Sequence, residues 1–312
     1  MLIVTGGAGF IGSNIVRGLN DTGRDDVIVV DDLTDGHKYT NIVDRSIADY
    51  WDKRELSGRL ESLDEPPDAI LHQGACAVTT EWDGRYMLAE NYQCSVDLLG
   101  YCTRHKVPLI YASSAAIYGA GTSFGESDPS VERPLNVYGY SKLLFDRYVR
   151  RHAATAGAQV VGLRYFNVYG PNEAHKGAMA SVVWHLTRQL RETGELKLFE
   201  GSHGYADGEQ RRDFIHVDDV VAVVLWFLEH PAVSGIFNVG TGKSASFNDL
   251  ARAVIECLGT GEIRYVPFPS DLEASYQSFT QADLSALREA GYAAPFDDVR
   301  AGVRKYLDAI NA

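Results

Sequence analysis

The chain of 312 residues is long enough to bury a large core and to fold as one large domain or two. Its formal net charge of −13 repels a polyphosphate, so nucleic-acid binding is not expected, although a local group of Arg and Lys side chains could still hold a small anion. Four cysteines without CxxC spacing suggest reduced, buried thiols and no metal site, and the absence of a long apolar segment predicts a cytoplasmic chain without membrane contact.

Short β-branched runs alternate along the chain with segments whose apolar residues recur at spacings of three and four. This alternation is typical of a parallel sheet with helices on both faces. The fold class predicted is therefore α/β, a doubly wound parallel sheet of the Rossmann type. We expect strands in the segments 2–6, 27–32, 69–75, 109–114, 160–167 and 236–240, and crossover helices in 13–21, 85–104, 138–154 and 217–228.

A glycine-rich turn stands between the first strand and the first helix. Gly6, Gly9 and Gly12 form a GxxGxxG pattern there, which lets the backbone approach a pyrophosphate at a helix N-terminus. Asp31 ends the second strand, where a carboxylate normally accepts a hydrogen bond from the ribose 2′-OH of NAD. These residues predict a nicotinamide dinucleotide as cofactor.

Two lysines bear on which dinucleotide is bound. Lys38 and Lys53 follow in the same loop region, and either could neutralise the 2′-phosphate of NADP. Charge patterning alone gives about equal weight to solvated surface lysines. The residues by themselves therefore leave NAD and NADP both open.

A tyrosine and a lysine share a face of the third predicted helix. Residues four apart on a helix are neighbours, so Tyr138 aligns with Lys142, whereas Tyr140 does not. A neighbouring ammonium lowers the pKa of a phenol and prepares it for proton transfer. A hydroxyl of Ser113 or Ser114, at the end of the fourth strand, could hold the substrate oxygen. Chance alone supplies about 0.4 Tyr-x-x-x-Lys matches here, so the motif has weight only beside the glycine turn and the serines.

The pattern changes after residue 167. A helix-like stretch over 178–193 and a Gly-rich loop over 199–210 precede the resumption of the strand and helix rhythm, and one further strand-like run covers 263–268. We assign these parts to a smaller, discontinuous α/β lobe that binds the substrate. The predicted domains are 1–167 with about 213–240 for the nucleotide, and about 168–212 with 241–312 for the substrate.

Several motifs together carry a resemblance to a known family. The segments "TGGAGFIG", "SSAAIYG", "YGYSK", "RYFNVYGP" and "RRDFIHVDDV" span most of the chain and resemble the extended short-chain dehydrogenase/reductases that act on nucleotide sugars. Within that family, "TTEWDGRYM", "LNVYGYSKLLFD", "RYFNVYGPNEAHKGAMASV", "KLFEGS" and "YQSFTQADL" are similar to the ADP-L-glycero-D-manno-heptose 6-epimerases.

The resemblance implies an isomerase. A tightly held NADP would take a hydride from C6″ of ADP-D-glycero-D-manno-heptose and return it to the other face of the transient ketone, without net redox change. It further implies a role in heptose supply for lipopolysaccharide core synthesis, and a homo-oligomer, which the family suggests is a homopentamer.

The family match also implies the catalytic roles. It selects Ser114 over Ser113, makes Tyr138 with Lys142 one acid/base, and supplies Lys176 as a second acid/base for the opposite face. One group cannot easily serve both faces unless the intermediate turns in the pocket. Charge patterning alone would leave Lys176 an exposed lysine.

The binding residues implied by the match form two sets, with no metal ligand among them. The cofactor set is Gly6, Gly9, Phe10, Ile11, Gly12, Asp31, Asp32, Lys38, Lys53, Gln73, Gly74, Ala75, Cys76, Ala77, Asn91, Tyr138, Lys142 and Val168. The substrate set is Asn167, Ala178, His185, Phe199, Glu200, Gly201, Ser202, Arg212 and Tyr276. Arg212 would be a pyrophosphate fork, although "RRDF" also suits a structural Arg and Asp pair.

Three positions near the cofactor depart from the family's usual residues. Asp32 replaces an Asn, Gln73 a Glu, and Glu90 an Asn. Asp32 adds negative charge beside any 2′-phosphate, so NAD stays an alternative to NADP.

Three other functions occur on folds of this kind. A sugar-nucleotide 4,6-dehydratase would carry an Asp-Glu pair where this chain has Ala115 and Ala116. A UDP-sugar 4-epimerase would use Tyr138 alone with a rotating keto intermediate and leave Lys176 idle. A non-catalytic NAD(P)-binding protein is compatible with the fold, but such proteins often lose the Tyr and Lys pair that this chain retains.

Overall fold

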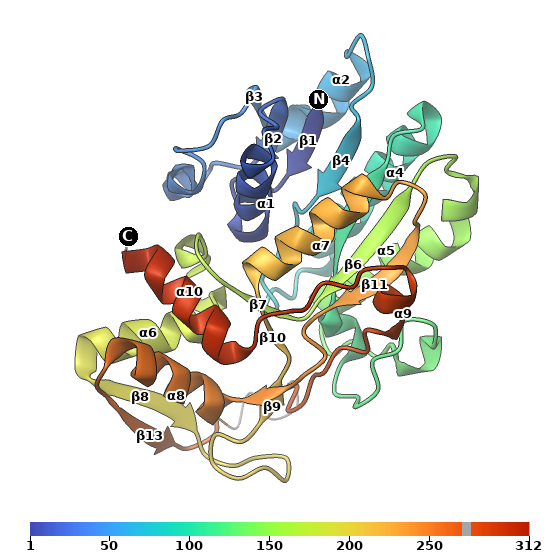
Figure 1. The fold of residues 1–312 in the computed structure, drawn as a ribbon. Coiled ribbons are helices and arrows are strands. Elements are labelled where there is room, and N and C mark those ends of the chain that lie inside the picture. The colour runs from blue at the N-terminus through green and yellow to red at the C-terminus, as the bar shows by residue number, and fades with distance from the viewer. Residues whose placement is uncertain (270–275, 312) are drawn as a thin grey trace. The chain divides into compact units, whose positions relative to one another are not determined.

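The computed structural model describes residues 1–269 and 276–311, shown as a ribbon in Figure 1. The chain divides into two compact units, each discontinuous in sequence. Residues 115–135, which the sequence places in the nucleotide domain, are part of the second unit. The first unit is Met1–Ser114, Asn136–Arg164 and Val221–Phe237, and the second is Ala115–Leu135, Tyr165–Val220 and Asn238–Ala312.

The first unit is built on a seven-stranded sheet in the order β11-β6-β5-β4-β1-β2-β3. The strand β1 pairs in parallel with both β2 and β4, so the strand order reverses beside β1. In such sheets ligands bind at the carboxyl ends of the strands that flank this reversal. The predicted Rossmann-type α/β fold class is confirmed. The strands are β1 Leu2–Thr5, β2 Val27–Asp31, β3 Asp49–Asp52, β4 Ala69–His72, β5 Leu109–Ser114, β6 Val160–Tyr165 and β11 Gly235–Val239.

Helices cover both faces of this sheet. Ile3, Ile28 and Ile70 belong to one apolar cluster with residues of α2, α4 and α5. On the other face α1 packs closely on α7, where a Cβ on Gly18 would lie 2.5 Å from a methyl group of Val221 (Figure 1). The helices are α1 Phe10–Asp21, α2 Leu56–Glu61, α3 Gly84–Leu88, α4 Cys94–His105, α5 Val137–His152 and α7 Val217–Glu229.

Several features of the first unit were not predicted, the short helix α2 among them. The edge strand β3 reads "DYWD" and lacks an apolar run, so its sequence gives no strand signal. The helix expected over 85–104 is instead α3, a π-helical segment η3 over Ala89–Gln93, and α4. In that segment the Asn91 side chain is buried and bonds the backbone N–H and C=O of Cys76 at 2.8 and 2.9 Å. π-helical turns are frequent at functional sites.

The second unit is assembled from short strand pairs and helices. The helices α6, α8 and α10 share one apolar core with β8, whose parallel partner is β13 (Figure 1). The strand β8 was not predicted, because "ELKLF" is short and polar at alternate positions. The elements are α6 Val182–Thr193, α8 Phe247–Leu258, α9 Ser285–Glu289, α10 Val299–Asn311, β7 Asn167–Tyr169, β8 Glu195–Phe199, β9 Arg211–Arg212, β10 Phe214–His216, β12 Ala245–Ser246 and β13 Glu262–Val266.

Short 3-10 turns connect these elements, and three of them carry predicted site lysines. These are η1 with Lys38, η2 with Lys53 and η7 with Lys176. Their bounds are η1 Gly36–Asn41, η2 Lys53–Glu55, η4 Ala115–Tyr118, η5 Pro129–Val131, η6 Ala153–Thr155 and η7 Ala174–Met179.

The four cysteines are free thiols. Cys102 is buried, but Cys94 is exposed, so the expectation of burial was wrong for Cys94, which lies at the start of α4. Among the described residues, none of the helices combines the length and apolar character that a membrane span requires.

Candidate functional site

The glycine turn at the end of β1 leaves no room for side chains. Gly6 has φ +66°, and a Cβ there would lie 2.7 Å from the backbone nitrogen of Gly74. A Cβ on Gly12 would collide with the carbonyl oxygen of Gly6. The turn leads directly into α1, whose N-cap is Gly9. A close backbone approach at the N-terminus of a 12-residue helix is the arrangement that receives a pyrophosphate.

Asp31, at the end of β2, is buried, and both of its carboxylate oxygens accept hydrogen bonds. Its Oδ2 accepts a hydrogen bond from the Ala8 N–H at 2.7 Å. Its Oδ1 accepts from the Lys38 ammonium at 2.5 Å and from the Asp32 N–H at 2.6 Å. The carboxylate thus ties the glycine turn to η1, and Lys38 is held by an ion pair.

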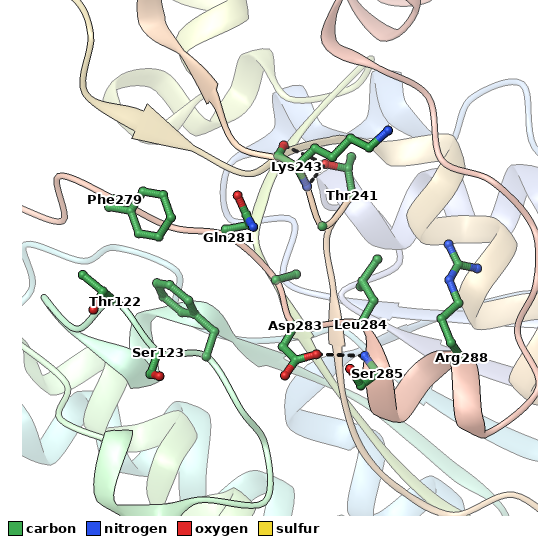
Figure 2. A pocket seen from close by; sticks show the side chains of 13 residues that line it. Thr122, Ser123, Thr241, Lys243, Phe279, Gln281, Asp283, Leu284, Ser285 and Arg288 are labelled. Carbon is green, nitrogen blue, oxygen red and sulfur yellow. Dashed lines mark hydrogen bonds between the residues drawn. The ribbon is translucent and has the colours of Figure 1, made fainter.

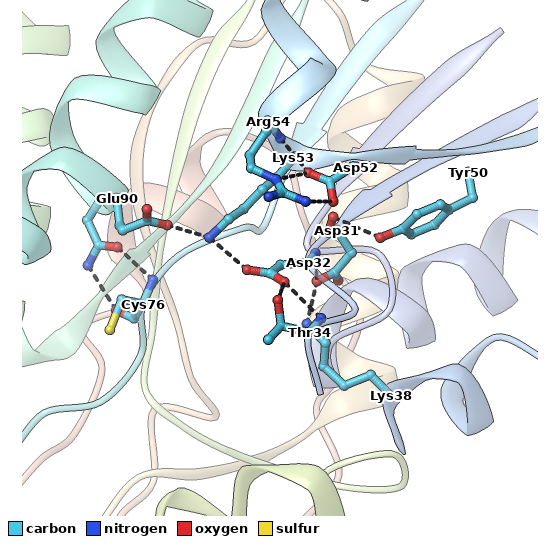
Figure 3. Close-up of polar contacts among 11 residues, drawn as sticks. Asp31, Asp32, Thr34, Lys38, Tyr50, Asp52, Lys53, Arg54, Cys76 and Glu90 are labelled. Atoms are coloured by element: carbon cyan, nitrogen blue, oxygen red, sulfur yellow. Dashed lines mark hydrogen bonds and ion pairs between the residues drawn. The ribbon is translucent and has the colours of Figure 1, made fainter. Parts of the chain in front are cut away.

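Lys53 lies between two carboxylates of the same unit (Figure 3). Its Nζ is 3.1 Å from Asp32 Oδ2 and 2.9 Å from Glu90 Oε2. Both lysines that the sequence offered for a 2′-phosphate are therefore already paired with carboxylates. Glu90 was noted only as a departure from the family, since its partner lies far away in the sequence.

The loop after β4 is anchored to the start of α5. The amide of Asn91, which holds the backbone of Cys76, also donates to the Ser141 hydroxyl at 3.1 Å. That hydroxyl in turn donates to the Tyr138 carbonyl at 2.7 Å. Residues 73–77, predicted to contact the cofactor, are thus connected to the helical turn that carries Tyr138.

The structure brings together three of the four predicted catalytic residues. Helix α5 starts at the N-cap Asn136, whose side chain accepts from the Gly139 N–H at 2.8 Å, and this places Tyr138 in the first turn. The Tyr138 hydroxyl is hydrogen-bonded to the side chain of Ser114, at the end of β5. One turn further, Lys142 is buried and donates to the Ala112 carbonyl at 2.9 Å.

The pKa values of Tyr138 and Lys142 differ from those that the spacing of the two residues predicts. Desolvation raises the pKa of Tyr138, and the hydrogen bond from Ser114 only partly offsets this. Burial lowers the pKa of Lys142 to about 8, while the nearby Asp146 carboxylate acts in the opposite direction. The expectation of a lowered pKa for Tyr138 was therefore wrong for this structure, because desolvation is the largest effect on this group.

The two serines of β5 serve different partners. Successive residues of a strand point to opposite faces. Ser113 donates to Asp146 at 3.0 Å and is buried, whereas Ser114 is bonded to Tyr138. The structure thus distinguishes Ser114, which contacts Tyr138, from Ser113. The spacing of the residues alone could not make this distinction.

A buried network underlies Tyr138 and Lys142. The Asp146 carboxylate accepts from the Tyr111 hydroxyl at 2.9 Å, from Ser113, and from the Arg164 guanidinium at 2.9 Å. Asp146 and Arg164 both have side chains that are 0% exposed. This ion pair, between α5 and β6, was missed in the sequence because its members belong to different elements.

We expect Asp146→Asn to lower the free energy of unfolding by about 3–5 kcal/mol, because it leaves a buried guanidinium without its counter-charge. Urea unfolding followed by circular dichroism measures the change. Tyr111→Phe is the matched control, which removes one hydrogen bond to the same carboxylate and should cost about 1 kcal/mol. If both variants lost the same free energy of unfolding, the ion pair would not be the main contribution of Asp146 to stability.

Arg212, on β9 of the second unit, is a buried cation beside aromatic rings. Its side chain is 7% exposed, and the guanidinium lies 4.8 Å from the ring centre of Tyr276 and 5.9 Å from that of Phe247. Burial lowers the pKa of Arg212 to about 10, which leaves it charged at neutral pH. Within the described parts of the chain it forms no ion pair. Such a cation suits an anionic ligand.

The alternative reading of "RRDF" as a structural Arg and Asp pair does not apply. Asp213 accepts instead from the backbone N–H groups of Thr241, Gly242 and Ala282, at 2.7, 2.9 and 2.9 Å. Arg211 donates to the Ser244 carbonyl. Arg212 donates to the Arg211 carbonyl at 3.4 Å and lies against its aromatic neighbours.

An aromatic group surrounds Tyr276. The Tyr276 ring centre is 5.0 Å from that of Phe268 and 6.1 Å from that of His203, and Phe268 lies 5.4 Å from Phe199. His203 and Phe268 were not among the predicted residues. Phe199 and Tyr205, the aromatic residues of the Gly-rich loop, were the signal that could have drawn attention to this region, since aromatic faces stack on nucleobases.

Lys176 lies on η7, within the second unit. It is half-buried, and burial lowers its pKa while the nearby Glu173 carboxylate acts in the opposite direction. Glu173 is buried and accepts from the Ser181 N–H and hydroxyl at 2.5 and 2.7 Å, which ties the turn to the start of α6. Gly177, with φ +53°, completes the turn. Glu173 was not predicted.

The remaining predicted residues also divide between the units. The cofactor set belongs to the first unit except Val168, and the substrate set belongs wholly to the second. Asn167 and Val168 lie on β7, Ala178 on η7, His185 on α6, and Phe199 to Ser202 at and after the end of β8.

A cavity of about 670 Å³ opens elsewhere in the second unit (Figure 2). Phe124, Lys243, Phe279 and Asp283 are among its lining residues, and none of the predicted site residues is. Arg288, at its rim, donates to the carbonyl groups of Tyr292 and Ala294. The cavity therefore does not coincide with the candidate site.

Comparisons with known proteins identify the family of this chain. Residues 2–240 match the model of the NAD dependent epimerase/dehydratase family. The chain is 60% identical, over 99% of its length and 97% of the relative's, to an ADP-L-glycero-D-manno-heptose-6-epimerase of Alkalilimnicola ehrlichii. The Helicobacter pylori enzyme of the same name has a crystal structure with 32% identity and a TM-score of 0.85, covering 100% of this chain and 96% of that one.

A second solved structure is the Thermus thermophilus UDP-glucose 4-epimerase in complex with NAD, with 28% identity, a TM-score of 0.82, and coverage of 100% and 99%. The resemblance drawn from the motifs is confirmed by the far higher identity to the heptose enzyme. With its glycine turn, its Ser, Tyr and Lys group and its family match over most of its length, the chain belongs to the NAD dependent epimerase/dehydratase family.

Proposed function

We propose that this chain is an ADP-L-glycero-D-manno-heptose 6-epimerase that interconverts the D-glycero and L-glycero forms of ADP-heptose. The observation that carries the proposal is the Ser114 and Tyr138 hydrogen bond with Lys142 one turn away, in a chain 60% identical to a relative of that name. We place this activity in the cytoplasm, in heptose supply for lipopolysaccharide, and in a homo-oligomer. The oligomer is a pentamer by the family resemblance.

The residues present fit a nicotinamide dinucleotide, since side chains at Gly6 or Gly12 would fill the cradle that its pyrophosphate needs. NADP, when bound, supplies the acceptor and later the donor of the C6″ hydride. Lys38 and Lys53, both paired with carboxylates, are the cations that its 2′-phosphate would meet. Lys142 would contact the ribose hydroxyls of the bound cofactor.

The chain's own groups would move the proton. Tyr138 takes the proton of the C6″ hydroxyl as the hydride leaves, and Ser114 holds the oxygen of the resulting ketone. Lys176 returns a proton to that oxygen when the hydride comes back to the opposite face. Each turnover leaves one proton more on Tyr138 and one fewer on Lys176, and proton exchange with solvent restores both groups. The hydride returns to the substrate, so no cofactor is consumed.

The test is direct. Purified protein is incubated with ADP-D-glycero-D-manno-heptose, and the epimer ratio is followed by NMR in deuterated water. We expect interconversion without net NADPH formation and without deuterium at C6″, because the hydride returns from the cofactor. A protein that binds cofactor but leaves both epimers unchanged would contradict the proposal, as would one that interconverts only UDP-glucose and UDP-galactose.

Arg212 would hold the pyrophosphate of the substrate, and the aromatic group around Tyr276 would stack on the adenine. We expect Arg212→Met to weaken ADP binding by about 10- to 100-fold, from the loss of charge-assisted hydrogen bonds. Calorimetric titration with ADP measures this. The control is Arg188→Met, which changes an exposed arginine of the same unit. A less than threefold change for Arg212→Met would remove Arg212 from the binding site.

A further inference from the structure

The most unusual feature of the predicted cofactor site is the arrangement around Lys53 (Figure 3). Lys53 begins η2, directly after the edge strand β3, and β3 pairs with β2. Asp32 follows β2, and Glu90 lies on the π-helical segment η3. Three separate elements thus bring an ammonium between two carboxylates, at 3.1 and 2.9 Å.

The three side chains are all partly exposed, with exposed fractions of 39% for Lys53, 35% for Asp32 and 31% for Glu90. Partial burial acts to lower the pKa of Lys53, but the hydrogen bonds from Glu90 and Asp32 outweigh it and raise the pKa. Lys53 therefore stays charged and paired throughout the neutral range. Asp32 is fixed further by Thr34, whose N–H donates to it at 2.9 Å.

The position of Lys53, Asp32 and Glu90 indicates which part of a bound dinucleotide these side chains would contact. It lies next to Asp31, at the carboxyl end of β2, where the ribose of a dinucleotide bound on the glycine turn carries either a 2′-hydroxyl or a 2′-phosphate. A hydroxyl needs only an acceptor such as Asp31. A phosphate brings about 1.5 to 2 negative charges and needs cations to offset them.

The balance of charge here is unfavourable for a phosphate. Lys38 is paired with Asp31, and Lys53 with Asp32 and Glu90, so two cations face three carboxylates. Arg54, a further cation in Figure 3, is held by both oxygens of Asp52 at 2.9 Å. A 2′-phosphate would meet lysines that are already neutralised and would lie beside carboxylates that repel it.

We propose that Asp32 and Glu90 are cofactor-specificity residues, which hold Lys53 in an ion-paired bridge and so cancel most of the advantage of NADP over NAD. The protein accordingly binds NAD about as well as NADP. This inference rests on the proposed function for the identity of the cofactor, but it concerns binding and not turnover.

The experiment measures dissociation constants of NADP and NAD by calorimetry, on full-length protein stripped of nucleotide. We expect the two constants of the unchanged protein to agree within tenfold. Asp32→Asn and Glu90→Gln should each raise the affinity for NADP by about tenfold and leave that for NAD within threefold. Both substitutions keep the shape of the side chain, and the amide introduced by Asp32→Asn retains an oxygen that can accept from the Thr34 N–H.

Asp44→Asn is the matched control, since it removes one exposed carboxylate that pairs with Arg45 and does not contact Lys53. We expect it to leave both constants unchanged. The inference is overturned if the unchanged protein prefers NADP by more than tenfold, if Glu90→Gln leaves the ratio unchanged, or if Asp44→Asn shifts the ratio equally. Failure to epimerise heptose, with these constants as expected, would overturn only the proposed function, whereas failure to bind either nucleotide would overturn both.

Discussion

Tyr138→Phe is expected to lower the rate of epimerisation by about a thousandfold or more while the protein still binds its cofactor. The phenol oxygen is the only atom removed, and it is the atom hydrogen-bonded to Ser114. Proton transfer by a positioned side chain contributes about 10²- to 10⁴-fold to a rate, and here the same oxygen must also orient the substrate hydroxyl. The epimer ratio over time, measured by NMR, gives the rate.

Tyr140→Phe is the matched control for this substitution. Tyr140 lies two residues further along α5 and is 43% exposed, so its hydroxyl points away from Ser114. We expect the control to keep the full rate. If Tyr138→Phe retained more than a tenth of the activity, Tyr138 would not be the acid/base of the reaction. Bound nicotinamide dinucleotide, detected in both purified variants, would show that the cofactor site is intact.

The features that the sequence predicted well depend on local rules. The glycine turn requires small residues at fixed spacing because Gly6, Gly12 and Gly74 approach one another through the backbone. The choice of Tyr138 over Tyr140 follows from helix periodicity alone, and the structure places Lys142 on that face. The buried strands of the first unit were found because their apolar runs are continuous.

The features that were missed depend on contacts between residues far apart in the chain. The partners of Asp146 come from β5 and β6, and the sequence around Asp146 contains no pattern that predicts these contacts. The π-helical turn that carries Glu90 arises where Asn91 binds the loop after β4. The strand β3 is polar and forms only because β2 offers it an edge. Charge and periodicity along the sequence do not report such pairings.

The pKa of Tyr138 illustrates the same limit. Sequence spacing places an ammonium one turn away and predicts a lowered pKa, but it carries no information on how far the site is desolvated. Burial raises the pKa of Tyr138 and lowers that of Lys142 to about 8. Spacing along the helix therefore predicts which side chains meet, but not the direction in which burial shifts their pKa values.

Lys176→Met is expected to lower epimerisation by at least a hundredfold, and in a manner that differs from Tyr138→Phe. Burial lowers the pKa of Lys176, which makes it a better proton carrier near neutral pH than a solvated lysine. Its backbone is held by η7, where the Lys176 N–H donates to the Glu173 carbonyl at 3.0 Å. Removing the ammonium should therefore leave the turn intact. Lys197→Met, an exposed lysine on β8, is the control.

The two-base proposal assigns one acid/base to each epimer, so each variant should fail with a different one. Single-turnover mixing of enzyme with one epimer at a time, followed by the absorbance of reduced nicotinamide, separates the cases. We expect Tyr138→Phe to block oxidation of one epimer, and Lys176→Met to block oxidation of the other while a transient signal persists with the first. If Lys176→Met oxidised both epimers at the normal rate, Tyr138 alone would serve both faces, and the ketone would have to turn within the site.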